Sequence, residues 1–523
     1  MRKVIAVRVN YSQLVGLGHL YRMLRFVKTL SKKYRIIFFI DKKKDLIVKK
    51  FNYEFIEVYE GNNKFKSEIE DAKKIKRLIK KLKINYFIID DYRIGIKWEK
   101  FFYQKQKLII FDDLNNRKHL CDFIIDSKHT GEETKKRYEH LVPKNCQKLL
   151  GPIYSIINSD LEKKQKTKKN LLLYFGGGGD LSKYYNFFKY LVKANKLKKS
   201  KNKINITLVI GPLAEKFKKF LQFKKNKNVK ILNNVINLKH VLEDTSMYFG
   251  VSSSIIYELN FLKIPACVFS KNDNQTNQTS NLEELGIYFQ IREKDLISDY
   301  KKTSNLIFTF FNNFKKVSDI TNYRKIKIDK KACKRIENII FKSNNNYKKN
   351  YTKNYTNNKI QKNGFYKIND SLINKYLFFR NQKINRLVSI NKKKIENIDH
   401  YLWWFMTQRI SFYYVKNYKI KLIFSQEIIK IFKKYFWYGA WFKCEGIVNF
   451  SEIIDGLNSQ IKKTQKIKNL KWFAIIKKNN PSVFYINKLI GFKEEKFFLK
   501  SNINSIIKNF NIKKIKNYYF LTK

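Results

Sequence analysis

The sequence feature that most constrains the fold is a repeated pattern: a short apolar segment, a loop rich in glycine or acidic residues, then a helical segment. The N-terminus shows it first. Residues 4–9 are mostly apolar, a loop containing Gly16 and Gly18 follows, and from His19 onward apolar residues recur at helical spacing. Parallel strands joined by crossover helices produce this pattern. His19 is therefore expected at the carboxyl edge of a parallel sheet, where ligands bind.

The same pattern continues in two blocks along the chain. A helix is expected at 67–82, where Ser67 and Glu70 have the spacing of a capping box. We predict an α/β protein with two Rossmann-like domains, at residues 1–160 and 161–340, and a cleft between them. The expected strands that follow the first one are 35–41, 85–91, 107–113, 121–126, 204–211, 229–234, 247–254 and 265–270, and the segment 170–180 is expected to be a strand that leads into a glycine loop.

The composition changes between residues 344 and 363, where a run of mainly Asn, Lys, Tyr and Thr contains a single aliphatic residue. Such a segment has too little apolar surface to pack. We therefore predict a flexible linker at 341–368. Beyond it, helical and strand-like segments alternate with a different rhythm, so residues 369–523 are predicted to form a third domain of α+β type.

Composition and charge narrow the class of protein. The net charge of +67 would attract polyanions, but the basic residues are nearly all lysine and are spread along the whole chain. Base readout uses Arg, Asn and Gln at defined positions, so specific nucleic-acid binding is not expected. No signal peptide and no apolar run of about 18 residues is present. The five cysteines form no CxxC pair, so we expect a cytoplasmic protein without disulfides or structural zinc. We also expect a monomer.

Two loops have the composition of phosphate-binding segments. Gly176, Gly177 and Gly178 follow an expected strand and precede a helical segment, so their N–H groups can surround a diphosphate. A tight turn between strand and helix would explain the glycines equally well. The second loop supplies three hydroxyl groups, from Ser252, Ser253 and Ser254. Four carboxylates end two strands without a histidine at ligand spacing, so no metal is expected: Asp90, Asp91, Asp112 and Asp113.

Eight short blocks in register resemble a known enzyme family. They are Arg8 with Gly16–Arg22, Ile88–Tyr92, Phe111–Asp113, Cys121–Asp122, Gly151–Tyr154, Phe175–Gly178, Ser252–Glu258 and Asn274–Gln275. This part of the chain resembles the hydrolases of the pseudaminic acid pathway, which remove UDP from UDP-2,4-diacetamido-2,4,6-trideoxy-β-L-altropyranose. That family has the GT-B fold of the glycosyltransferase that makes peptidoglycan lipid II.

The resemblance implies an activity and a set of site residues. His19 would orient or deprotonate the attacking water, with Tyr92 nearby, and the anomeric carbon would be inverted as UDP leaves, without a cofactor. Glu258 would bind the ribose, and Asn274 and Gln275 the acetamido groups. The remaining substrate-binding residues would be Arg8, Gly16, Gly18, Arg22, Gly176, Gly177, Gly178, Ser252, Ser253 and Ser254. The chain departs from the family at Asn10 and at 156–159, which bears on the identity of the sugar.

Residues 373–500 resemble the GNAT superfamily of N-acetyltransferases. The matching pieces are Arg380-Asn381 with Arg386, His400-x-x-Trp403-Trp404, the Ala474–Ser482 segment and Lys488–Phe492. The resemblance implies that Lys443, Gly446 and Asn479 bind acetyl-CoA. Val448 stands where the family has a small residue, so the domain is either a drifted acetyltransferase or an inactive one.

Two other functions are compatible with the sequence. A glycosyltransferase on the same scaffold would transfer the sugar from a UDP-amino sugar to an acceptor other than water. A protein that binds polyanions through charge would instead bind duplex DNA with a steep salt dependence and would not need His19.

Overall fold

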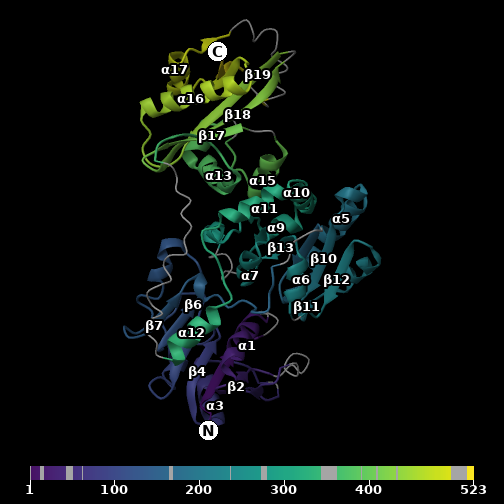
Figure 1. The fold of residues 1–523 in the computed structure, drawn as a ribbon, viewed down its shortest axis with the longest axis vertical. Helices are drawn as coiled ribbons and strands as arrows, with labels where there is room; N and C mark the ends of the chain where they lie inside the picture. The colour runs from purple at the N-terminus through teal and green to yellow at the C-terminus, as the bar shows by residue number, and fades with distance from the viewer. Residues whose placement is uncertain are drawn as a thin grey trace. The chain divides into compact units, whose positions relative to one another are not determined.

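A computed structural model describes residues 2–11, 17–42, 51–61, 63–163, 169–235, 237–271, 279–342, 362–389, 392–407, 410–431, 434–495, 510 and 515–523. The chain divides into two compact units, Met1–Asn357 and Asn358–Lys523 (Figure 1). Within the described ranges, no helix has the length and apolar character needed to cross a membrane.

The first unit begins with a seven-stranded parallel sheet. Its strands are β1 (Val4–Val9), β2 (Arg35–Ile40), β3 (Glu54–Glu57), β4 (Ile84–Asp90), β5 (Lys107–Phe111), β6 (Phe123–Asp126) and β7 (Gln147–Leu150), in the order β3-β2-β1-β4-β5-β6-β7. The helices between them are α1 (Gly18–Leu30), α3 (Glu68–Leu78) and α4 (Ile96–Glu99). As predicted, Ser67 caps α3: its side chain accepts a hydrogen bond from the Glu70 backbone N–H at 3.2 Å.

A second parallel sheet follows in the same unit, in the order β12-β10-β8-β13-β14-β15. Its strands are β8 (Asn170–Tyr174), β10 (Asn205–Ile210), β12 (Val229–Asn233), β13 (Met247–Val251), β14 (Ala266–Phe269) and β15 (Phe289–Gln290). A small separate sheet pairs β9 (Gly178–Asp180) with β11 (Leu213–Glu215). The helices are α5 (Tyr185–Lys196), α6 (Lys239–Asp244), α7 (Ile255–Leu262), α9 (Glu293–Ile297), α10 (Tyr300–Asn312) and α11 (Phe314–Ile320).

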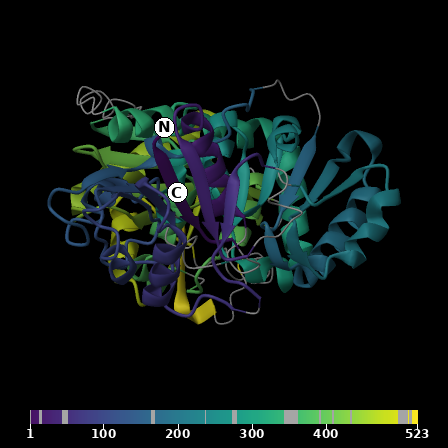
Figure 2. The ribbon, with the colours of Figure 1, turned by 90° about the horizontal axis from the view of Figure 1, so that it is seen from below.

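Both sheets have the strand order of a Rossmann-like fold. Counted along the chain within each sheet, the order is 3-2-1-4-5-6, with a seventh strand added to the first sheet. Figures 1 and 2 show them as two separate sheets. The last helix of the unit, α12 (Ala332–Phe341), returns to the first lobe, where Ile336 and Ile340 join the apolar core around α1. The prediction of two Rossmann-like folds in series is therefore confirmed.

The second unit is built on a mostly antiparallel sheet in the order β16-β17-β18-β19-β20-β22-β21. The strands are β16 (Gly364–Lys367), β17 (Ile410–Lys416), β18 (Lys419–Ile431), β19 (Lys434–Lys443), β20 (Trp472–Lys477), β21 (Lys493–Glu494) and β22 (Tyr518–Thr522). The helices are α13 (Ile373–Asn381), α14 (Lys383–Val388), α15 (Asn397–Met406), α16 (Phe450–Ile467) and α17 (Pro481–Leu489). The unit thus mixes helices with an antiparallel sheet.

One pair in this sheet is parallel and short. β19 and β20 pair only through Trp437 with Trp472 and Tyr438 with Phe473, after which the two strands separate. Strands that part inside a sheet leave room between them that side chains from neighbouring helices fill only in part. A cavity lies where these two strands separate, and it is described below.

The structure corrects the upper limit of the predicted linker. Gly364–Lys367 form β16, which pairs antiparallel with β17 through Phe365 with Tyr414 and Tyr366 with Tyr413. The linker prediction extended to residue 368 because the segment before residue 364 is polar, and four residues carry little periodic signal by themselves. The pairing partner that stabilises this strand lies about 50 residues later in the chain, beyond the reach of local patterning.

Candidate active sites

The first candidate site centres on His19 at the carboxyl edge of the first sheet. His19 is the second residue of α1, and Asp90 is the last residue of β4, which lies beside β1 with Val9 opposite Asp90. The His19 Nδ1 atom lies 2.5 Å from Asp90 Oδ1. His19 is 8 % exposed, and Asp90 is fully buried. The parallel topology thus joins the start of a helix and the end of a neighbouring strand.

Arg22 and Tyr92 extend this pair into a network. The Arg22 guanidinium donates to both carboxylate oxygens of Asp90, at 2.8 and 2.6 Å, and to Asp113 Oδ2 at 2.7 Å. The Tyr92 hydroxyl donates to the same Asp113 oxygen at 2.7 Å. The Tyr92 ring meets the His19 ring edge-on, with centroids 4.5 Å apart. The structure therefore brings together three residues that the sequence resemblance named separately: His19, Arg22 and Tyr92.

Charge and burial in this network favour an ionised Asp90 beside a neutral phenol. Burial by itself would raise the pKa of Asp90, but the Arg22 guanidinium and His19 lower it below its ordinary value. Burial raises the pKa of Tyr92, and Asp113 raises it further. A carboxylate at Nδ1 stabilises the tautomer whose proton lies on Nδ1, so that Nε2 can accept a proton. The arrangement is that of an oriented general base.

Asp90 and Asp113 were not predicted as members of this site. The sequence showed acidic residues after two buried strands, and we inferred from their spacing only that they bind no metal. Two neighbouring parallel strands that both end in carboxylates place those groups at one edge, beside any histidine that follows a third strand. That signal, combined with His19, could have identified Asp90 as the partner of the imidazole.

Arg8 requires a correction, because the structure gives it a structural role in place of the predicted contact with substrate. Its side chain is completely buried, and the guanidinium contacts Asp71 Oδ2 at 2.7 Å and Asp41 Oδ1 at 2.6 Å. Burial by itself would lower the pKa of Arg8, but Asp71, Asp91 and Asp41 raise it above its ordinary value. No atom of Arg8 reaches the surface.

The predicted glycine loop lies at the carboxyl edge of the second sheet, directly after β8. Gly176 and Gly179 have φ values of +103° and +88°, which side chains other than glycine rarely adopt. A Cβ atom on Gly177 would lie 3.6 Å from the backbone nitrogen of Leu17, the residue before α1. The loop therefore adjoins the start of the helix that carries His19. It continues as β9 rather than entering a helix directly, and α5 begins only at Tyr185.

The serines and the glutamate predicted to bind substrate lie around the start of α7. Ser252 follows β13, and its buried Oγ atom has no hydrogen-bond partner within the described part of the chain. Ser254 is the residue before the helix. Glu258 is buried, forms an ion pair with Arg25 at 2.9 Å and accepts a hydrogen bond from the Asn158 backbone N–H at 3.1 Å, so protein groups already hold the proposed ribose ligand.

The other predicted site residues lie outside the described residues or next to the helix starts of the two lobes. Gly16, Asn274 and Gln275 lie outside the described residues. Gly18 is the first residue of α1, and a Cβ atom there would meet open space. Ser253 lies between Ser252 and Ser254 in the loop before α7. The roles of these residues toward a substrate stay predictions.

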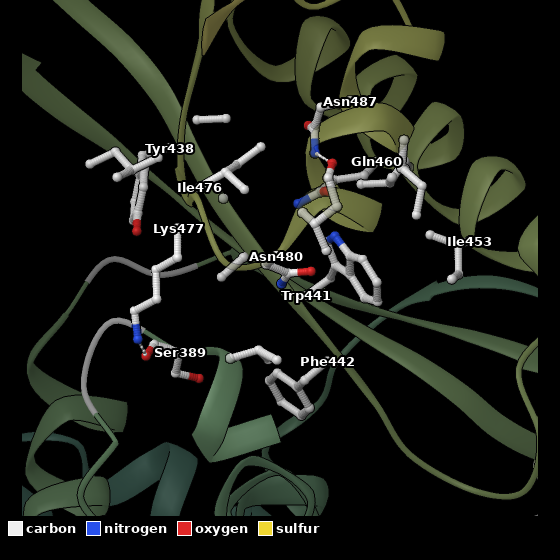
Figure 3. A pocket seen from close by; sticks show the side chains of 18 of the residues that line it. Ser389, Tyr438, Trp441, Phe442, Ile453, Gln460, Ile476, Lys477, Asn480 and Asn487 are labelled. Carbon is white, nitrogen blue, oxygen red and sulfur yellow. Dashed lines mark hydrogen bonds between the residues drawn. The ribbon is translucent and has the colours of Figure 1, made fainter. Parts of the chain in front are cut away.

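The second candidate site is a cavity of about 670 Å³ where β19 and β20 separate. Figure 3 shows Tyr438, Lys477 and Ser389 toward one side of it, and Gln460 and Asn487 toward the other. The charged side chains among the described lining residues are all basic: Arg380, Lys443 and Lys477. Lys477 donates to the Ser389 carbonyl. The charge of these side chains therefore suits a ligand that carries negative charge.

The residues predicted to bind acetyl-CoA have different relations to this cavity. Lys443 lines it, and its backbone N–H donates to Asn385 Oδ1 at 3.1 Å. Asn480 lines it, whereas its neighbour Asn479 is not among the lining residues. Gly446 follows β19 in a turn with φ +68° and also lies outside the lining.

The two Rossmann-like lobes define the first unit as an α/β protein of the GT-B type. No protein-family model matches the chain, and no curated protein matches it. Among solved structures it is similar to MurG of Acinetobacter baumannii, with 12% identity, 65% of this chain and 100% of that chain covered, and a TM-score of 0.44.

Two further solved structures show a similar likeness. A putative UDP-N-acetylglucosamine 2-epimerase from Listeria monocytogenes has 11% identity, covers 66% of this chain and 98% of its own, and gives a TM-score of 0.44. S. aureus MnaA, in a structure with UDP, has 12% identity. The match covers 65% of this chain and 96% of that chain, with a TM-score of 0.43. The fold assignment itself rests on the strand order of the two sheets.

Proposed function

We propose that the first unit hydrolyses a UDP-diacetamido-trideoxy sugar to the free sugar and UDP, as its sequence blocks suggest. The observation that carries the proposal is the His19–Asp90 pair, 2.5 Å apart, next to a glycine loop of the second lobe. An oriented imidazole beside a candidate diphosphate cradle is what attack of water on a UDP-sugar requires. We also propose that the two lobes of the first unit are separate domains, which meet near residue 160 and end near residue 340.

The chemistry follows from these groups. Asp90 holds the Nδ1 proton of His19, and Nε2 takes a proton from water as the water oxygen bonds to the anomeric carbon. The bond from that carbon to the diphosphate oxygen breaks, and its electron pair leaves with UDP, so the carbon is inverted. UDP is a stable leaving group, so most of the work is positioning and charge stabilisation. Loop N–H groups at Gly176–Gly178 would stabilise the departing charge.

A hydrolase and a glycosyltransferase on this scaffold differ in what they require. A glycosyltransferase would use the same base to activate an acceptor hydroxyl, and would release UDP only with that acceptor present. A hydrolase needs only water. Incubating the full chain with the UDP-diacetamido sugar in the absence of an acceptor therefore separates the two functions.

The His19→Asn variant tests the assigned base in that assay. We expect its rate of UDP release to be lower by about 10²–10⁴-fold, the usual contribution of a general base. The matched control is His240→Asn, because the His240 side chain is 84% exposed and belongs to a helix of the second lobe. If the wild type released UDP only when an acceptor was present, the result would support the glycosyltransferase. Equal rates for wild type and His19→Asn would remove His19 from the mechanism.

A second activity is proposed for the other unit, N-acetyl transfer from acetyl-CoA to an amino sugar. The observation that favours it is the separation of the parallel strands β19 and β20 around a cavity with a basic lining. A cofactor that carries phosphates and a long thin arm suits such a space, with Lys443 near the phosphates. Calorimetric titration of the full chain with acetyl-CoA tests the proposal. Lys443→Met should weaken binding, whereas the control Lys419→Met, at an exposed lysine, should not. A wild-type chain that does not bind acetyl-CoA would refute the proposal.

A further inference from the structure

We propose that Lys271 is a diphosphate-binding residue of the first unit, with its ammonium group placed over the glycine loop. The inference rests on the proposed function, because it assigns a ligand for the UDP group of that substrate. Nothing in the sequence blocks pointed to Lys271, which directly follows β14 and Ser270.

The position of the ammonium group is the first observation. Lys271 Nζ donates to the carbonyl of Phe175, the residue before the glycine loop, at 3.1 Å. The same atom lies 3.9 Å from the Cβ position of Gly176 and 3.7 Å from that of Gly179. In the sheet, β13 lies between β8 and β14. The lysine side chain therefore reaches across the end of β13 to the loop that follows β8.

The second observation is that several hydrogen-bond donors lie at the carboxyl edge of the second sheet. Gly176 and Gly179 expose backbone at positive φ, where no side chain blocks close approach. Ser252, at the end of the intervening strand, has a fully buried hydroxyl with no hydrogen-bond partner among the described residues. Lys271 adds a positive charge. Backbone N–H groups, a hydroxyl and an ammonium at the ends of three adjacent strands form the donor set of a phosphate site.

The electrostatic surroundings agree with this assignment. Burial lowers the pKa of Lys271, and the nearby Lys183 lowers it further, whereas Glu293 acts in the opposite direction. Glu293 is itself engaged: Lys183 Nζ lies 2.7 Å from its Oε1, and the Tyr184 hydroxyl donates to it. Glu293 thus acts on both ammonium groups at this edge. A bound phosphate would offset the repulsion and the burial, and its binding would favour the protonated form of Lys271.

The test compares UDP with uridine as probes of the full chain by calorimetric titration. The two ligands share the nucleoside and differ only in the diphosphate. For Lys271→Met we expect UDP to bind at least about ten-fold more weakly while uridine binds as in the wild type. Lys271→Arg should retain most of the preference for UDP. The control is Lys193→Met, an exposed lysine of α5 in the same lobe.

The outcomes separate this inference from the function on which it rests. If wild type binds UDP and Lys271→Met binds it equally well, the role of Lys271 is refuted and the proposed function stands. Equal losses for UDP and uridine in both Lys271 variants would show a structural role and would also refute the inference. Wild-type protein that binds neither ligand would refute the proposed function together with it.

Discussion

The two units place chemistry in the fold in different ways. In the first unit, parallel strands end at a common edge, and the residues that follow them meet there, as His19 and Asp90 do. In the second unit, neighbouring strands are mostly antiparallel, and the one parallel pair separates to open a cavity inside the sheet. A parallel sheet gathers charged groups at its rim, whereas a separated pair makes a space that a long ligand can cross.

The electrostatic character of the two sites differs accordingly. The rim of the first unit holds interleaved carboxylates and guanidinium groups, such as Asp90, Arg22 and Asp113, that orient each other. The described lining of the cavity in the second unit carries charge of one sign. We infer that the first site is organised before its ligand binds, and that the second site favours a ligand with negative charge.

The largest expected effect tests the organised rim. Asp90→Asn removes the carboxylate that holds His19 Nδ1 and leaves two donors of Arg22 without their acceptor charge. We expect UDP release to fall by about 10²–10⁴-fold, because a misoriented imidazole no longer presents a basic Nε2 to water. Acetyl-CoA binding by the same chain should not change, and serves as the internal control. An unchanged rate of UDP release would show that the charge network is only structural.

A smaller effect concerns pH and a buried histidine of the first unit. His119 Nδ1 lies 2.6 Å from Glu99 Oε1, and Nε2 lies 3.8 Å from Asp112. Burial by itself would lower the pKa of His119, but Asp112 and Glu99 raise it to about 9. The ordinary value in an unfolded chain is about 6.5, so the stabilisation is complete below that pH and is lost as pH rises through about 9.

Thermal unfolding of the full chain between pH 6 and pH 10 measures this effect. The transition of the first unit should lose stability with rising pH, and His119→Gln should reduce that slope. Ionisable groups elsewhere affect wild type and variant alike, so the difference between the two reports His119. Identical slopes would mean that His119 is not charged in the folded protein.

The last prediction is that cutting the chain between the two units leaves both activities unchanged. A protease site inserted between residues 344 and 363 and then cut should leave UDP release at the wild-type rate, because the groups proposed for hydrolysis all lie before residue 300. Acetyl-CoA binding should likewise persist. Loss of hydrolysis on cutting would mean that the first unit needs the second, and that the comparison between two separately organised sites is wrong.

Local patterning predicted much of this architecture. Most strands of the first unit were placed within a few residues, since a short buried strand bounded by glycine or acidic residues is a local signal. The short strands β3, β7, β11 and β15 were not predicted. The glycine loop and His19 were placed at the correct edges for the same reason. The segment at Gly364–Lys367 was missed, because its strand character depends on a partner elsewhere in the chain.

Arg8 shows where local reasoning about function fails. An arginine at the end of a first strand next to a glycine loop resembles a ligand contact, and the sequence has no means to show that Asp71, in a helix 63 positions later, occupies its guanidinium. His19 presents the opposite case. Its place at the edge of a sheet was predicted, but its partner Asp90, 71 positions away, was considered only as one of four carboxylates that are not expected to bind a metal.

The sequence alone determined the alternation of most strands and helices in the first unit, the polar segment between the two units, and the glycines of the loop after β8, where the backbone takes positive φ. These depend on neighbours within a few positions. Only the tertiary structure decided which charges pair, that Lys271 covers the glycine loop, and that β19 and β20 part around a cavity. Those contacts join residues far apart in the chain, and their energies depend on burial and distance, which exist only once the chain has folded.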